Sequence, residues 1–452
     1  MKADVSSLFV MLIALIVLVF MIMKLKVHPV FALILVAIGS AFGFQFPLTD
    51  VISTVTKGFG GTIGSIGIVI IFGCTIGIIL EQTGGALVLA NTILKIVGKK
   101  RSSLAMALSG YLVSIPVFSD SAIVILSPVA RALSARGGVP FFALLGALNA
   151  GILATHTMVP PTPGPLAAAG TLGADIGLVI ALGLISSLAY TFVASTYCSS
   201  NYALSRYPEV AQMNNVDTVV GDDFSIQTDK RLPGAFLTFA CILIPVILIC
   251  ANSFANMVLP ENAAVLPYLG FIGNPVPALA VGVVLSLFLD ASLFNRDQIY
   301  KWFDRAIESS GFIILATGAA GAFGAVLKAS GVGNYLGELI ASTPLPAVFV
   351  PYLVALLLSV SNGSATVSLL TGSAIILPLV PALGLHPVIA CLAIAAGSSF
   401  FYHANGSHFW VVVKINDLSM KEGYALVSFG SALGSIAGMV VVFIMSLFLT
   451  AS

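Results

Sequence analysis

Long apolar runs separated by short polar stretches dominate this chain, and each run approaches the length of a bilayer-crossing helix. Such a helix needs about 20 mostly apolar residues. Only 8% of the residues are charged, against about 25% in soluble domains. We therefore predict an all-α integral membrane protein with about ten spans. The runs lie near 5–23, 28–46, 62–80, 139–173, 175–197, 233–256, 274–293, 307–327, 387–413 and 424–450.

Composition and motifs argue against several other classes of protein. The net charge of +1 offers no basic surface for nucleic acid. The chain has no GxxxxGK[ST] motif, so ATP hydrolysis by this chain is not expected. The five cysteines have neither metal-ligand spacing nor a paired framework. We predict no enzyme activity, no cofactor and no metal. The first run lacks a small-residue cleavage site, so we expect a span rather than a signal peptide.

The distribution of lysine and arginine predicts the orientation in the membrane. With both termini outside and one crossing per run, 16 of the 19 basic residues fall on the cytoplasmic side, and only Lys2, Lys57 and Lys328 fall outside. Arg101 and Arg131 both lie inside, but only 29 residues separate them. Two crossings would need about 40 residues. Residues 102–130 are therefore predicted to form a re-entrant hairpin.

An internal repeat links two parts of the chain. Gly77-Ile-Ile-Leu-Glu-Gln-Thr-Gly84 resembles Gly324-Ala-Val-Leu-Lys-Ala-Ser-Gly331, and Val117-Phe-Ser-Asp-Ser-Ala122 resembles Val360-Ser-Asn-Gly-Ser-Ala365. We expect residues 1–197 and 233–452 to form two repeats of inverted topology, typical of alternating-access transporters. A cytoplasmic linker, 198–232, would join them. The second hairpin, 346–380, would enter from the outside.

Polar, glycine and proline residues break the apolar runs at equivalent places in both halves. In transporters with broken helices, substrates bind at such breaks near the middle of the membrane. Because both halves contribute breaks, we predict that they converge on one substrate site. The candidate substrate-binding residues are Ser119, Ser121, Thr155, Thr157, Thr162, Ser361, Asn362, Ser364, Thr366, Asn405 and Ser407.

Asp120 and His156 are the candidate proton-coupling residues. Asp120 is the only acidic residue of the first hairpin and lies at its centre. A carboxylate in the membrane is costly, and burial favours its protonated form, so Asp120 could take up and release a proton. It could instead cap a half-helix, or coordinate substrate or a cation. His156 lies in an otherwise apolar run and could relay a proton.

At these segments the sequence resembles the gluconate permease family of proton symporters, within the ion transporter superfamily. The resemblance lies in Pro116-Val-Phe-Ser-Asp120, Val159-Pro-Pro-Thr-Pro-Gly-Pro165, Gly363-Ser-Ala-Thr-Val367, and Gly397-Ser-Ser399 with Asn405, Ser407, Phe409 and Trp410. It implies proton-coupled uptake of gluconate or a related sugar acid across the bacterial inner membrane, with D-serine as an alternative substrate. It also suggests a homodimer, by analogy.

The sequence departs from this family at positions expected to lie in the substrate pocket. Family members usually have histidine at the position of Thr162 and aspartate at that of Gly406. His403 and His408 are unusual, and their contact with substrate stays open. Sodium coupling through the Ser361–Ser364 tip is an alternative to the proton. A channel would need a continuous polar stripe, and an intramembrane enzyme would need a catalytic pairing on a common helix; neither pattern is present.

Overall fold

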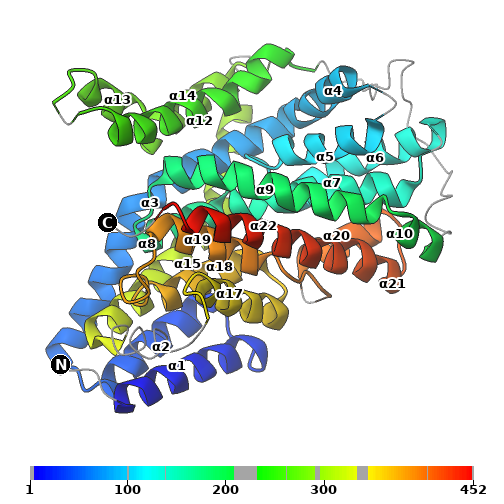
Figure 1. Ribbon diagram of the computed structural model, residues 1–452. Helices are drawn as coiled ribbons and strands as arrows, with labels where there is room; N and C mark the ends of the chain where they lie inside the picture. The colour runs from blue at the N-terminus through cyan, green and yellow to red at the C-terminus, as the bar shows by residue number, and fades with distance from the viewer. Residues whose placement is uncertain are drawn as a thin grey trace.

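In the computed structural model, residues 5–98, 101–137, 139–207, 232–260, 262–290, 296–332, 345–404 and 406–449 are described, and within these ranges all of the regular elements are helices (Figure 1). The first half contains α1 (Val5–Met23), α2 (Pro29–Gly43), α3 (Leu48–Thr83), α4 (Gly85–Val97), α5 (Ser102–Val113), α6 (Ser119–Gly137), α7 (Phe141–Met158), α8 (Pro163–Leu172), α9 (Ile176–Cys198) and α10 (Asn201–Arg206).

The second half contains α12 (Ala235–Val258), α13 (Leu266–Ile272), α14 (Pro275–Leu287), α15 (Arg296–Ser330), α17 (Phe349–Asn362), α18 (Ala365–Ile376), α19 (Pro387–Ser398), α20 (Ser407–Ile415), α21 (Met420–Gly423), a π-helical turn (Tyr424–Phe429) and α22 (Gly430–Ser446). The predicted linker, 198–232, lies largely outside the described residues, which end at Tyr207 and resume at Leu232.

Within the part of the chain that the structure describes, six helical stretches are long and apolar enough to cross a membrane, and the bent pair α13–α14 would make a seventh. The multi-pass all-helical class is therefore confirmed, whereas the number of ten spans and the inverted repeats stay predictions. The stretch formed by α7 and α8 is 94% buried, and α12 is only 33% buried. α12 exposes large apolar side chains such as Phe236, as expected of a helix that faces lipid.

Both predicted hairpins fold as two helices separated by a short break. In the first, α5 ends at Val113 and α6 begins at Ser119; in the second, α17 ends at Asn362 and α18 begins at Ala365. α5 and α18 each contain 12 residues, about 18 Å of helix against the ~30 Å of a bilayer core. Helices of this length suit segments that enter the membrane and turn back. Their entry from opposite sides stays a prediction.

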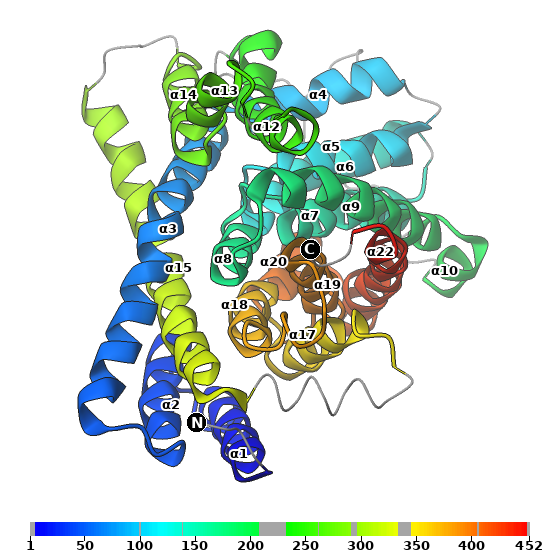
Figure 2. The same ribbon diagram turned by 60° about the vertical axis from the view of Figure 1, so that its left-hand side comes forward.

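Two long helices, α3 and α15, cross each other at one side of the molecule (Figure 2). Glycines allow the two backbones to approach closely: a Cβ on Gly58 would collide with Gly321 and Ala325, and a Cβ on Gly318 would collide with Phe59. α1 and α2 lie beside one end of this pair, and α12 and α14 lie beside the other. We call α3 and α15 the wall, because α8 and α18 pack against this pair.

Two runs that are apolar enough to be single spans are broken where the sequence shows polar and proline residues. The run 139–173 divides at Val159–Thr162 into α7 and α8, and the run 387–413 divides at Ser399–Gly406 into α19 and α20. The missing backbone hydrogen bonds at these breaks leave helix ends inside the protein. These breaks and the two hairpin tips bring the first turns of several helices close together.

Candidate functional site

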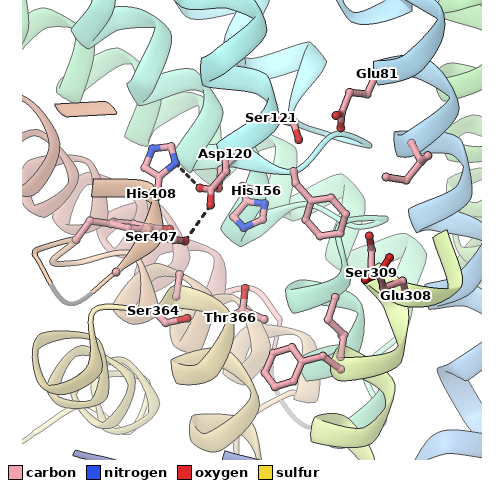
Figure 3. A pocket seen from close by; sticks show the side chains of 18 of the residues that line it. Glu81, Asp120, Ser121, His156, Glu308, Ser309, Ser364, Thr366, Ser407 and His408 are labelled. Carbon is pink, nitrogen blue, oxygen red and sulfur yellow. Dashed lines mark hydrogen bonds and ion pairs between the residues drawn. The ribbon is translucent and has the colours of Figure 1, made fainter. Parts of the chain in front are cut away.

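A cavity of about 570 Å³ lies between the wall and the hairpin helices. This volume falls within the range of ordinary small-molecule sites. Its lining comes from α3, α6, α7, α15, α18, α20 and the segment before α20 (Figure 3). The polar lining residues are Glu81, Gln82, Ser119, Asp120, Ser121, His156, Arg305, Glu308, Ser309, Ser364, Thr366, Tyr402, Ser407 and His408.

Three helices begin at this cavity. α6 begins at Ser119, α18 at Ala365 and α20 at Ser407, and all three residues line the space. The first turn of a helix carries unpaired N–H groups and the positive end of the helix dipole. Their convergence therefore gives the cavity a positive potential that favours an anion.

Local sequence explains the start of α18. Gly363 has φ +70°, a left-handed conformation that glycine adopts without a Cβ clash, and it ends α17. Ser364 then caps α18, because its hydroxyl accepts a hydrogen bond from the backbone N–H of Val367 at 3.4 Å. Gly363 and the Ser364 cap thus turn the chain within two residues and leave the first turn of α18 at the cavity.

Asp120 joins the first turns of α6 and α20. Its Oδ2 accepts a hydrogen bond from the Ser407 hydroxyl at 2.9 Å, and its Oδ1 lies 3.1 Å from Nδ1 of His408 (Figure 3). The Asp120 side chain is 40% exposed, whereas that of His408 is 4% exposed. Asp120 is therefore much more open to the cavity than His408, although both line it.

His408 also has a partner on its other ring nitrogen. Its Nε2 lies 2.8 Å from Oδ1 of Asn149, on α7. The ring of Tyr402 packs edge-on against the imidazole at 5.8 Å between ring centroids. Both nitrogens of a buried histidine are thus held, one by a carboxylate and one by an amide oxygen. This fixes the orientation of the ring.

His156 lies beside the same cavity but without such partners. It is 9% exposed, and its Nδ1 is buried with no hydrogen-bond partner among the described residues. An unpaired buried nitrogen is costly, so a ligand or water that reaches it would stabilise the site. His156 is therefore better suited to bind a substrate hydroxyl than to hold Asp120.

The structure brings seven of the thirteen predicted site residues together at the cavity: Ser119, Asp120, Ser121, His156, Ser364, Thr366 and Ser407. Thr155, Thr157 and Thr162 lie outside the lining. Their hydroxyls donate to the backbone carbonyls of Tyr111, Leu153 and Val159, at 2.9, 2.8 and 2.6 Å. The side chains of Ser361 and Asn362, and all of Asn405, lie outside the described residues.

Sequence reasoning missed several residues of the cavity. It left open whether His403 and His408 meet substrate: His408 contacts Asp120, whereas Nε2 of His403 lies 2.9 Å from the Val360 carbonyl oxygen, away from the cavity. Nothing in the sequence pattern connects Asn149 with His408. The pairing depends on the packing of α6, α7 and α20, which is a tertiary property.

The wall contributes a second group of charged residues. Glu81 of α3 and Glu308 of α15 lie across the cavity from Asp120 (Figure 3). Arg305 of α15 also lines the cavity. Glu308 and Arg305 are exposed side chains and Glu81 is half-buried. The cavity thus has one side made of helix starts, with Asp120 as its acidic side chain, and a wall side of mixed charge.

A family model described as "GntP family permease" matches residues 6–448 of the chain. A gluconate permease of Pseudomonas aeruginosa is 31% identical over 453 residues, which cover 99% of each chain. The inner membrane permease YgbN of Escherichia coli is 34% identical over 442 residues, which cover 93% of this chain and 94% of the relative.

Among solved structures, the chain is similar to Neisseria gonorrhoeae MtrF, whose description places it in a class of antimetabolite efflux pumps. The TM-score is 0.67 at 16% sequence identity, and the match covers 95% of this chain and 97% of the other. At this level of identity the likeness concerns the fold, and it places the helical arrangement among those of transporters.

Proposed function

The chain belongs to the GntP permease family, and from that premise we propose that it takes up gluconate or a related sugar acid together with a proton. Its relatives are permeases rather than enzymes, and they include an inner membrane protein. With its apolar helices, the chain is a multi-pass inner membrane transporter. The substrate, the proton and the residues that bind them are the content of the proposal.

The observation that carries the proposal is the convergence of three helix starts, α6, α18 and α20, on one cavity. Backbone N–H groups and helix dipoles favour a carboxylate without placing a fixed positive side chain in the membrane. A small carboxylate therefore suits this site better than a cation or an apolar molecule.

Side chains around the helix starts suit the hydroxyls of a sugar acid. Ser121, Ser364 and Thr366 supply hydroxyl groups to the cavity. Such groups both donate and accept hydrogen bonds, as do the hydroxyls of the substrate. His156 supplies a ring nitrogen that has no partner among the described residues. This set favours a polyhydroxylated carboxylate, with D-serine as the alternative.

The position of the cavity suggests how the substrate would cross. The cavity lies at the boundary between the wall and the hairpin helices, and α8 and α18 contact the wall. If the hairpin helices moved along the wall, they would carry three helix starts and the bound anion with them. This is the elevator-like form of alternating access that the inverted repeats predict.

Proton coupling is assigned to Asp120, the acidic residue at the helix starts. Its partial exposure to the cavity gives it access to water. Sodium coupling through the Ser361–Ser364 tip is the alternative.

Uptake of radiolabelled gluconate into proteoliposomes tests the proposal. The purified chain is reconstituted, and a pH gradient or a sodium gradient is imposed in turn. We expect accumulation with the pH gradient and none with sodium alone. Unlabelled sugar acids and D-serine are added as competitors to rank the substrates.

Two controls fix the interpretation. Protein-free vesicles measure passive leakage of the labelled substrate. Proteoliposomes treated with a protonophore measure uptake after the pH gradient has been abolished. Accumulation driven by sodium would reject the proton, and competition by D-serine alone would replace the sugar acid as substrate.

A further inference from the structure

We infer that Asp120 and His408 share a single proton, and that Asn149 determines which nitrogen of His408 takes part in the sharing. A substrate anion can then bind at the helix starts only after this proton is bound. The inference deepens the proposed function and rests on it only for the identity of the anion. Ser407, Asp120, His408 and Asn149 form a continuous series of close contacts, and the inference is based on the distances between them.

The number of protons follows from the contacts of His408. Oδ1 of Asn149 is an acceptor, so Nε2 of His408, 2.8 Å away, must donate a proton to it. Nδ1 then faces Oδ1 of Asp120 at 3.1 Å. If the ring were neutral and the carboxylate charged, two lone pairs would meet at this distance. A hydrogen bond therefore needs one proton, carried by Nδ1 or by Oδ1.

The two ways of placing this proton have the same total charge. Either a charged imidazolium faces a carboxylate, or a neutral imidazole faces a carboxylic acid. Transfer between them moves one proton from Nδ1 to Oδ1, and the Nε2 proton stays on the ring, donated in a hydrogen bond to Oδ1 of Asn149. Because the two groups interact strongly, the pair gains and loses its proton as a unit.

Asp120 is the route by which the proton arrives. Its side chain is 40% exposed and lines the cavity, whereas His408 is 4% exposed. Water in the cavity can thus exchange a proton with the carboxyl group, and His408 can hold it in a drier place. Ser407 donates to the other carboxylate oxygen at 2.9 Å, which keeps Oδ1 directed at the ring.

Other titratable groups lie near the pair but form no hydrogen bond with Asp120 among the described residues. His156 on α7 shares the cavity and interacts with Asp120 through charge alone, and Tyr402 packs edge-on against the His408 ring. Glu81 on α3, and Arg305 and Glu308 on α15, belong to the opposite wall. Arg131 on α6 pairs instead with Asp417, at 3.4 Å. His408 is therefore the proton partner of Asp120.

The charge of the pair controls the charge of the anion site. Without the shared proton, the pair is negative and sits at the first turns of α6 and α20, where it neutralises their positive ends. A substrate anion would then meet a like charge. With the proton, the pair is neutral and the helix starts are free to attract the anion. Proton and substrate thus bind together because each removes an obstacle to the other.

The proton count is tested without substrate. Protein labelled with ¹⁵N-histidine is placed in nanodiscs, and the His408 resonances are identified by their absence in His408→Gln. We expect Nε2 to carry a proton across the pH range. Asp120→Asn removes the carboxylate that shares the proton, so the Nδ1 resonance should change to that of an unprotonated nitrogen while Nε2 keeps its proton. An unchanged Nδ1 resonance, or a neutral ring protonated only on Nδ1, would overturn the inference.

The coupling is tested by comparing two modes of transport in the same vesicles. In His408→Gln, accumulation driven by a pH gradient should fall to that of protein-free vesicles. Exchange of labelled for unlabelled substrate should continue only at low pH, where Asp120 itself is protonated and no longer opposes the anion. His403→Gln is the matched control, because His403 contacts the Val360 carbonyl oxygen away from the cavity, and this variant should retain accumulation. If His408→Gln accumulates substrate like the wild type, His408 holds no coupling proton.

Asn149 provides the variant that separates a proton role from a structural role. Asn149→Asp keeps the shape and an acceptor oxygen, and its charge would hold the ring proton more tightly. The pH of half-maximal uptake should rise by about one unit. Asn149→Leu keeps the size without an acceptor and should lose accumulation. Equal effects of the two substitutions on the pH profile would contradict the role given to Asn149. Failure of gluconate transport in the wild type would reject the substrate but leave the NMR result standing.

Discussion

The two hairpin tips are built alike but differ in chemistry. Each places the start of a helix, α6 or α18, at the same cavity. In the repeat, Asp120 of the first tip corresponds to Gly363 of the second, and Ser121 corresponds to Ser364. The first tip therefore has a carboxylate with hydrogen-bond partners, whereas the second has a left-handed glycine and neutral hydroxyls.

This difference separates two tasks within one site. The backbone of both tips can attract an anion, because that property comes from the helix start and needs no particular side chain. Only the first tip has an acidic side chain that can cancel the attraction and restore it on protonation. We expect the second tip to bind substrate and the first to decide when it binds.

A negative charge on the second tip should cause the largest loss of substrate affinity. In Ser364→Asp, the aspartate can still cap α18, so the helix should form. A fixed charge about 6 Å from the substrate carboxylate would weaken binding by roughly 3 kcal/mol, about a hundredfold, at an effective dielectric constant near 20. The affinity is measured by competition in the exchange assay. Ser364→Asn, a neutral cap, is the control, and equal affinities would show that the second tip does not bind the anion.

A side chain at Gly406 should disturb the contact between the second tip and α20. A Cβ on Gly406 would collide with the carbonyl oxygen of Gly363. We expect Gly406→Ala to destabilise the protein by about 1–3 kcal/mol and to lower uptake. Thermal unfolding in detergent measures this. Gly311→Ala, where a Cβ meets nothing within 4 Å, should unfold like the wild type. If Gly406→Ala unfolds at the wild-type temperature and takes up substrate like the wild type, the second tip and α20 are not in contact.

Removal of one hydroxyl from the second tip should have a smaller effect. Thr366→Val keeps the shape and removes the hydroxyl that lines the cavity. The loss of one hydrogen bond to substrate corresponds to about 0.5–1.5 kcal/mol, roughly a two- to twelvefold weaker affinity. Thr157→Val is a suitable control, because that hydroxyl donates to the Leu153 carbonyl outside the cavity. If Thr157→Val weakens affinity as much as Thr366→Val, the effect comes from packing.

The membrane potential should have the smallest effect. One acidic tip implies one proton, and one proton with a monovalent anion moves no net charge. Each elementary charge moved across 100 mV corresponds to about 2.3 kcal/mol, roughly a fiftyfold change in accumulation. We expect a potassium-diffusion potential to leave gluconate accumulation nearly unchanged. A strong dependence on the potential would mean that a second proton or another ion is carried.

Sequence patterns predicted the parts of this molecule that depend on local chemistry. Apolar runs indicated the helices, and polar breaks indicated the hairpin tips and the divided runs at Val159–Thr162 and Ser399–Gly406. They placed Asp120, Ser364 and Ser407 at one site, and the cavity contains all three.

The parts that depend on packing between distant segments could not be read from the sequence. Asp120 and His408 are 288 residues apart, and His408 and Asn149 are 259 apart. Thr155 and Thr162 looked like His156 in their surroundings along the chain. Their hydroxyls instead bond to backbone carbonyls, because α7 and α8 turn them away from the cavity.

The most direct measurement is transport by Asp120→Asn in two modes, in vesicles that hold equal amounts of protein. Asparagine keeps the size and the hydrogen bond with Ser407 but cannot exchange a proton. The account predicts that the variant exchanges labelled for unlabelled substrate at all pH values, while a pH gradient no longer drives accumulation. If Asp120→Asn still accumulates substrate in response to a pH gradient, Asp120 does not carry the coupling proton and the central claim is wrong.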